Sequence, residues 1–308
     1  MNRGLKRMAI WNAALMYLVL QMGALVTNTG SADGCGASWP LCKGTWMPDW
    51  DYEAIIEFSH RAVSGLAGLA TLVLAVWVWR ASRSPLLRGL SAAGAGLVSF
   101  QGALGAMAVI WPQPKAVLAL HFGISLLCFS AVLLVAVLLS RQPEAERWPA
   151  APVAPLVRRW VWQMALFVYA VVYLGAYVRH LRAGLACLGW PLCNGQLVPS
   201  LNGLTGVNFA HRVGAALVVV MALRLTLLAQ RYLRDRPDLQ QAAGLALMLV
   251  LMQAASGAVI ALGYFNVITQ MGHTLIIALF WGTLSYLCLE VTPGYTYGRR
   301  TVGQSAPG

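Results

Sequence analysis

The stretch EAIIEFSHRAVSG, residues 53–65, places a His-Arg pair at the start of a long apolar run. A second stretch, NFAHRVGAA at residues 208–216, repeats the pair at the start of another apolar run. Ionisable side chains inside membrane segments are costly and usually belong to functional sites. His60 and His211 therefore predict two related sites, each near the start of a membrane helix.

Composition supports the membrane interpretation. Of the 308 residues, 59% are apolar and only 10% are charged, whereas soluble domains carry about 25% charged residues. Runs of about 20 apolar residues are long enough to cross a bilayer as helices, and the uniform runs lack the alternation of a β-barrel. Eight such runs occur, at 8–27, 56–79, 90–110, 116–140, 158–178, 207–230, 240–262 and 267–289. The sequence predicts an all-α integral membrane protein with eight transmembrane helices.

Two segments between these runs contain the same tetrapeptide, WPLC, at residues 39–42 and 190–193. Other polar residues recur at the same spacing of 151 or 152 positions: Cys35 and Cys187, Cys42 and Cys193, His60 and His211, Gln101 and Gln253, His121 and His273. A repeat with an even number of spans inserts twice in the same direction, so its pseudo-two-fold axis lies along the membrane normal. We therefore expect two tandem, pseudo-two-fold-related four-helix bundles, residues 1–141 and 158–308, joined by a Pro- and Ala-rich cytoplasmic linker at 142–157.

The basic residues predict the orientation. The net charge is +12, and sixteen of the 22 Lys and Arg residues fall in the termini and alternate loops, as expected for cytoplasmic segments. This distribution puts both termini in the cytoplasm and loops 28–55 and 179–206 outside the cell membrane. It also explains the positive charge without nucleic acid. The first apolar run resembles a secretory signal, but its length and the lack of a cleavage site favour a membrane helix.

Four of the five histidines fall near the outer ends of helices, two in each half: His60, His121, His211 and His273. Facing imidazoles in a helix bundle suit the two axial positions of a haem iron. Zinc or copper is the alternative, although zinc prefers three or four ligands. The fifth histidine, His180, is expected to be interfacial.

Glu57 distinguishes the two halves because its counterpart is Asn208. Residues three apart share a helix face, so Glu57 is expected to project toward whatever His60 binds. There it serves as an acid or base beside one haem only; the alternative is a carboxylate among lipid headgroups. This asymmetry favours the N-terminal half as the reaction site and the C-terminal half as a resident cofactor site.

Four cysteines lie in the two external loops, where oxidising conditions permit disulfides. We expect the pairs Cys35–Cys42 and Cys187–Cys193. A structural role is the simplest for the second pair, whereas the first, near Glu57, is a candidate for redox chemistry or a structural link. Cys128 and Cys288 fall inside helices and are expected to be packing residues.

Six motifs together resemble the haem A synthase family, of the bacterial type with paired external cysteines: NTGSADGCGASWPLC, EFSHRAVSG, ALHFG, ACLGWPLCNG, NFAHRVG and MGHTL. The resemblance runs through all eight spans. It implies an enzyme that oxidises the C8 methyl group of haem O to a formyl group, which gives haem A for terminal oxidases. Haem O synthase is then a candidate partner, with a homo-oligomer as another.

The resemblance also implies roles for single residues. His211 and His273 match the ligands of a haem b cofactor, and His60 and His121 lie where the substrate haem binds. Glu57 matches the catalytic acidic position. Two further positions match the family's redox-active cysteines, Cys35 and Cys42.

Two arginines next to the histidines, Arg61 and Arg212, are candidate partners of haem propionates because a guanidinium group binds carboxylates in a fork. Contact with lipid headgroups is the alternative. Two other functions explain the four histidines: a di-haem b-type electron-transfer protein that uses quinol, and a haem carrier. Neither gives a reason for an acid beside only one histidine pair.

Overall fold

The computed structural model describes residues 3–141 and 153–292, which contain eight long helices and no strand longer than an isolated bridge. The helices are α1 (Arg3–Thr29), α2 (Tyr52–Ala81), α3 (Pro85–Ile110), α4 (Lys115–Arg141), α5 (Pro155–His180), α6 (Gly203–Tyr232), α7 (Pro237–Ala261) and α8 (Val267–Val291). Each is long and apolar enough to cross a membrane. The prediction of eight membrane helices is confirmed.

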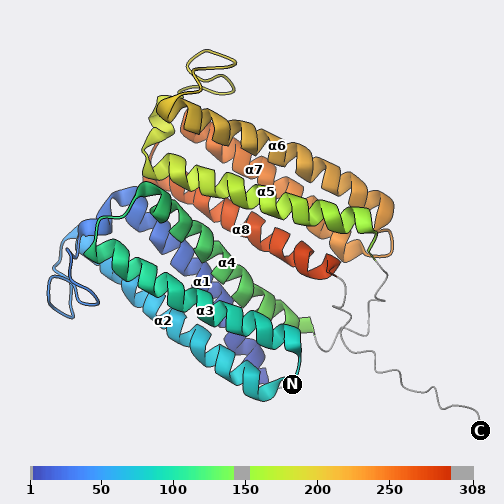
Figure 1. The fold of residues 1–308 in the computed structure, drawn as a ribbon, viewed down its shortest axis with the longest axis horizontal. Coiled ribbons are helices and arrows are strands. Elements are labelled where there is room, and N and C mark those ends of the chain that lie inside the picture. Colours follow the sequence, from blue (N-terminus) through green and yellow to red (C-terminus); the bar gives the residue numbers. More distant parts are fainter. Residues whose placement is uncertain (1–2, 142–152, 293–308) are drawn as a thin grey trace, which may run out of the picture.

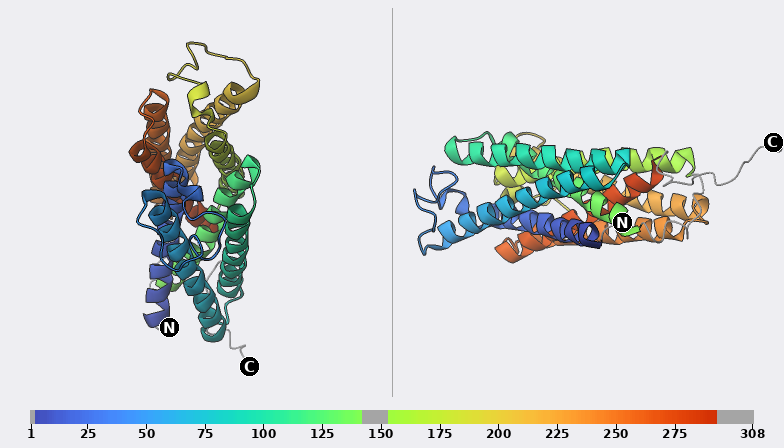
Figure 2. Two further views of the ribbon diagram at one scale, coloured as in Figure 1. Left: turned by 90° about the vertical axis from the view of Figure 1, so that its left-hand side faces the viewer. Right: turned by 90° about the horizontal axis from the view of Figure 1, so that it is seen from below.

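The helices lie roughly side by side, with α1 to α4 in one group and α5 to α8 in the other (Figure 1). In each group the first helix contacts the second and fourth, and the third contacts the second and fourth. The groups meet where α4 contacts α5 and where α8 contacts α1 and α4; Figure 2 gives two further views of this arrangement. The pseudo-two-fold relation itself remains a prediction.

Two loops project from one end of the bundle, one at the left and the other at the top of Figure 1. They are residues 30–51, which include the short helix η1 (Ser31–Asp33), and residues 181–202, which include η2 (Ala183–Ala186). Because each loop contains one disulfide, we call this the disulfide end.

Local sequence sets several helix starts. The side chain of Asp51 accepts a hydrogen bond from the Ala54 N–H at 2.7 Å and caps α2, as an N-cap aspartate does. Helix α5 begins at Pro155, a residue well suited to the first helical position. The end of the expected linker at 142–157 is therefore helical, and residues 142–152 lie outside the described part.

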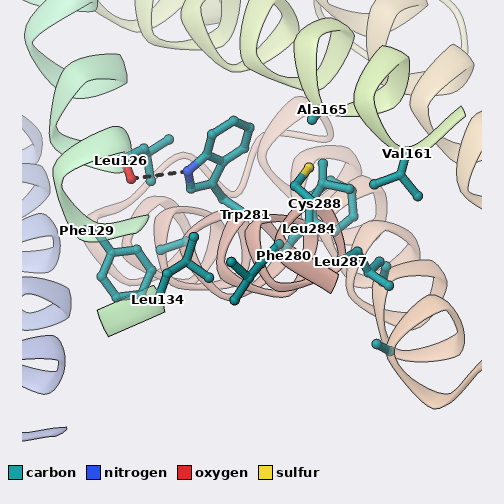
Figure 3. Packing of buried hydrophobic residues seen from close by; sticks show 14 of the residues in the cluster. Leu126, Phe129, Leu134, Val161, Ala165, Phe280, Trp281, Leu284, Leu287 and Cys288 are labelled. Atoms are coloured by element: carbon teal, nitrogen blue, oxygen red, sulfur yellow. Dashed lines mark hydrogen bonds between the residues drawn. The ribbon is translucent and has the colours of Figure 1, made fainter. Parts of the chain in front are cut away.

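A cluster of buried residues lies where α8 meets α4 (Figure 3). The Trp281 indole on α8 donates hydrogen bonds to the Leu126 carbonyl at 3.1 Å and the Ser130 hydroxyl at 2.7 Å, both on α4. Trp281 is only 6% exposed, and its neighbours Phe280 and Leu284 are almost completely buried. This seam of apolar contacts and indole hydrogen bonds joins the two halves.

Replacing Trp281 with Ala should destabilise the protein by about 3–5 kcal/mol, because it removes a large buried side chain and leaves a cavity. The thermal unfolding midpoint in detergent measures the effect. The control is Trp162→Ala, since Trp162 is 46% exposed on the surface of α5 and its loss should change the midpoint little. Equal midpoints for the two variants would contradict this view of the seam.

Candidate functional site

One cavity of about 1300 Å³ extends between the two halves toward the disulfide end. All four predicted histidines line it: His60 on α2, His121 on α4, His211 on α6 and His273 on α8. His180, expected to be interfacial, also lines this cavity. The structure thus brings both histidine pairs to one continuous space.

Each imidazole lies against a glycine on the preceding helix. An added Cβ would come within 3.2 Å of His60 at Gly23, 3.8 Å of His121 at Gly105, 2.6 Å of His211 at Gly175 and 3.3 Å of His273 at Gly257. The four glycines obey the repeat, since Gly175 follows Gly23 and Gly257 follows Gly105 by 152 residues. Sequence reasoning missed them, although the repeat spacing would have revealed them.

Glu57 is buried and holds α2 to the first cysteine loop. One carboxylate oxygen accepts a hydrogen bond from the Cys35 N–H at 2.7 Å. The other pairs with Arg61, 2.5 Å from Nη2 and 3.1 Å from Nε. Arg61 in turn donates to the carbonyls of Ser38 and Leu41, each at 2.7 Å. Glu57 and Arg61 both line the cavity, so the carboxylate lies between the cavity and the disulfide.

The C-terminal half repeats this arrangement without the acid. Arg212 donates through Nε to the Asn208 side-chain oxygen at 3.1 Å, and through its other nitrogens to the carbonyls of Gly189, at 2.7 Å, and Cys187. Asn208 donates to the Ala183 carbonyl at 2.8 Å. An arginine–amide contact thus replaces the ion pair, and the local charge differs by one carboxylate.

The cysteines occupy the expected environments. The structure contains the disulfides Cys35–Cys42 and Cys187–Cys193, and all four cysteines are buried. Cys128 and Cys288 are free thiols buried inside helices, as expected of packing residues. Because the Cys35 N–H binds Glu57 directly, the first disulfide adjoins the predicted reaction site.

An exposed charge cluster supports the start of α2. The Lys43 ammonium lies 2.9 Å from Asp51 and 3.1 Å from Asp49. The hydrogen bond from the Ala54 N–H, followed by that from Lys43, lowers the pKa of Asp51 below its usual value. A lowered carboxyl pKa adds stability above the unfolded-state pKa that is lost as the pH falls through the folded-state value. The start of the helix that carries Glu57 should therefore lose this stabilisation as the pH falls.

Arg179, near the end of α5, connects the two halves at the cavity. Its guanidinium donates to the Ala24 carbonyl at 3.0 Å and to the Asn28 side-chain oxygen, both on α1. Arg179 also lines the cavity. Sequence reasoning assigned it no role, because its partners lie in the other half of the chain.

Several known proteins are similar in sequence to this chain along nearly its whole length. The model of the COX15-CtaA family, described as cytochrome oxidase assembly protein, matches residues 47–285. A heme A synthase of Symbiobacterium thermophilum is 53% identical, over 99% of this chain and 100% of the relative. Heme A synthases of Shouchella clausii and Geobacillus kaustophilus are each 40% identical, covering 95% and 94% of this chain and 98% and 92% of the relatives. The chain therefore belongs to the haem A synthase family of cytochrome oxidase assembly proteins.

Proposed function

We propose that this chain is a membrane oxidoreductase that oxidises the C8 methyl group of haem O to a formyl group and so forms haem A. One observation carries the proposal: a single cavity contains two repeated histidine pairs, and among the described residues only one pair has a buried carboxylate nearby. Two equivalent electron-transfer sites would not need this difference. An enzyme with one substrate site and one cofactor site would.

The residues present fit haem. Each half offers two imidazoles, the ligand set of a bis-histidine haem, and the opposed glycines leave room for the imidazole rings beside the helix backbones. The cavity also exceeds the usual small-molecule pocket of about 300–1,000 Å³. We propose that His211 and His273 hold haem b and that His60 and His121 hold haem O. When bound, haem b supplies a one-electron redox centre.

Glu57 is the proposed catalytic residue. Its carboxylate lines the cavity, and its contacts to the Cys35 N–H and to Arg61 hold it in place. We propose that it accepts protons as the methyl group is oxidised, or stabilises positive charge that develops at that carbon. Both roles depend on a fixed charge in a site with little competing water.

The cysteine loops extend the proposal. Cys35–Cys42 adjoins Glu57 and is the candidate redox-active pair, whereas Cys187–Cys193 is the structural one.

Since disulfides persist on the oxidising side of a membrane, the disulfide end faces outward and both termini face the cytoplasm. The cofactor and substrate sites then lie toward the extracytoplasmic side of the cell membrane.

We propose that each half of the chain holds one of the two haems. Residues 1–141 form the substrate half, 142–157 the linker and 158–308 the haem b half. Arg61 and Arg212 line the cavity and remain candidate propionate partners, because a guanidinium has five N–H donors, although each already binds carbonyls of its own loop. Haem O synthase is the proposed supplier of substrate, and self-association is a further candidate interaction.

The direct test is to purify the protein from cells that also make haem O, extract the bound haems and separate them by chromatography with mass detection. Haem A, or a hydroxylated haem O, together with haem b is the expected result. Haem b alone, with supplied haem O unchanged, would favour the electron-transfer alternative.

Replacing Glu57 with Gln should lower the rate of haem A formation by about 100-fold or more, since general acid–base groups contribute about 10²–10⁴-fold. The amide keeps an oxygen for the Cys35 N–H, so the loop should stay in place. Haem b content, read from the optical spectrum, serves as the folding control. A variant with normal haem b and the parent rate would exclude the proposed role.

Replacing Gly175 with Ala should displace the His211 ring, because the new Cβ would lie 2.6 Å from its Cε1 atom. We expect most haem b to be lost, measured as haem per purified protein. Gly244→Ala is the matched control, since an added Cβ there meets nothing within 4 Å. Full haem content in the Gly175 variant would argue against haem b on His211.

A further inference from the structure

Hydrogen bonds enclose the imidazole of His273. Its Nδ1 atom lies 2.8 Å from the Ser256 hydroxyl, which lies 2.9 Å from the Gln253 carbonyl. The side-chain nitrogen of Gln253 lies 2.9 Å from the Nε2 atom of His273. One assignment satisfies all three contacts: the hydroxyl donates to the carbonyl, Nδ1–H donates to the hydroxyl, and the Gln253 amide donates to Nε2. The Nδ1–H bond to Ser256 thus fixes the tautomer in which Nε2 keeps its lone pair. In this structure the lone pair accepts from Gln253, and it is the one that would bind an iron atom once the amide moves aside.

The N-terminal half lacks this arrangement at His121, whose Nδ1 is buried without a hydrogen-bond partner. The position equivalent to Ser256, 152 residues earlier, is Leu104, which has no polar atom to offer. The Gln101 amide donates to the His121 carbonyl, at 2.8 Å, and to the hydroxyl of Ser125. Within residues 3–141 and 153–292, no side chain therefore fixes the tautomer of His121.

A second difference in residue type between the halves, besides Ser256 and Leu104, explains why the two glutamine amides point differently. The position equivalent to Ser125 is Ile277, so α8 has no hydroxyl there to compete for the amide of Gln253. Relative to the C-terminal half, the N-terminal half has a hydroxyl added on α4 and one removed from α3. Together, the two exchanges separate the glutamine from the imidazole.

The other histidine of each pair shows the same difference: a hydrogen bond selects its tautomer in the C-terminal half but not in the N-terminal half. The Nδ1 atom of His211 lies 3.2 Å from the Val171 carbonyl. A carbonyl only accepts, so this ring also carries its proton on Nδ1. The Nδ1 atom of His60 lies 3.4 Å from the Ser64 hydroxyl, which can donate or accept and does not select a tautomer.

Hydrogen bonds to the outer nitrogen of a ligating histidine orient its ring and increase its basicity, and their loss commonly weakens metal binding by about 10–100-fold. We propose that the Ser256 hydroxyl makes the C-terminal half a retaining haem site, and that Leu104 and Ser125 make the N-terminal half a releasing one. Ser256 is then a positioning residue that acts through His273. The inference rests on the proposed function, which requires one haem to stay while the other enters and leaves.

The first test uses full-length protein loaded with haem b and the variants Ser256→Ala and Ser256→Thr. Transfer of haem b to apomyoglobin should be about 10–100-fold faster for the alanine variant and close to the parent rate for the threonine variant, which keeps the hydroxyl. The alanine variant should also have a higher haem b midpoint potential, because a less basic ligand stabilises the ferric state less. Parent-like transfer and an unchanged potential in the alanine variant would overturn the proposal.

The reciprocal test converts the N-terminal half. The double variant Leu104→Ser/Ser125→Ile should retain more haem O or haem A through purification than the parent does, and should transfer it to apomyoglobin more slowly. Leu104→Ala/Ser125→Ile is the matched control, because it makes nearly the same changes in volume without adding a hydroxyl at position 104. If this control retains as much haem as the variant with serine at position 104, space rather than hydrogen bonding sets retention and the proposal is wrong.

The proposed enzyme function and the role of Ser256 can be disproved independently of each other. The Ser256 measurements use haem b alone and need no turnover, so they keep their meaning even if supplied haem O remains unchanged. Conversely, the protein could form haem A while Ser256→Ala changes neither the transfer rate nor the midpoint potential of haem b. That result would contradict only this inference and leave the proposed enzyme function intact.

Discussion

The close approach of a histidine ring to a glycine backbone is the contact on which the rest of the site depends. Four imidazoles lie near one end of a mainly apolar bundle, and each lies against a glycine of the preceding helix. Any larger residue at Gly175 would occupy the position of the His211 ring. Imidazoles in such a setting need polar partners, and the differences between the halves lie in those partners.

The two halves share a frame and differ at a few polar positions. Glu57 and Asn208 both receive a hydrogen bond from an arginine four residues later, but only Glu57 brings a negative charge. Ser256 and Leu104 occupy equivalent places, but only Ser256 hydrogen-bonds a histidine ring. We propose that the first difference concerns the chemistry at the bound haem and that the second concerns how long the haem stays bound. A duplicated sequence can thus provide two different sites through changes at single side chains.

Sequence reasoning could predict the features that depend on local pattern. The length of the apolar runs predicted all eight helices, and the repeat picked out the histidines and the cysteine loops. It did not predict that both histidine pairs line one cavity, because this depends on how α4 and α8 pack. The ring contacts of Ser256 and the reach of Arg179 to α1 were also missed, since each joins residues from different helices. The helix start at Pro155 was misplaced by three residues because a proline was taken for linker, although it suits the first helical turn.

The contact between α4 and α8 has a consequence for how the chain can vary. These helices hold equivalent places in the two repeats, and contact between equivalent elements is what a two-fold homodimer forms at its axis. In a homodimer every substitution at such a seam appears twice. Here both helices belong to one chain, so Trp281 can hydrogen-bond to α4 while its counterpart 152 residues earlier is Phe129 rather than a second tryptophan. Covalent fusion thus frees each side of the interface to change alone.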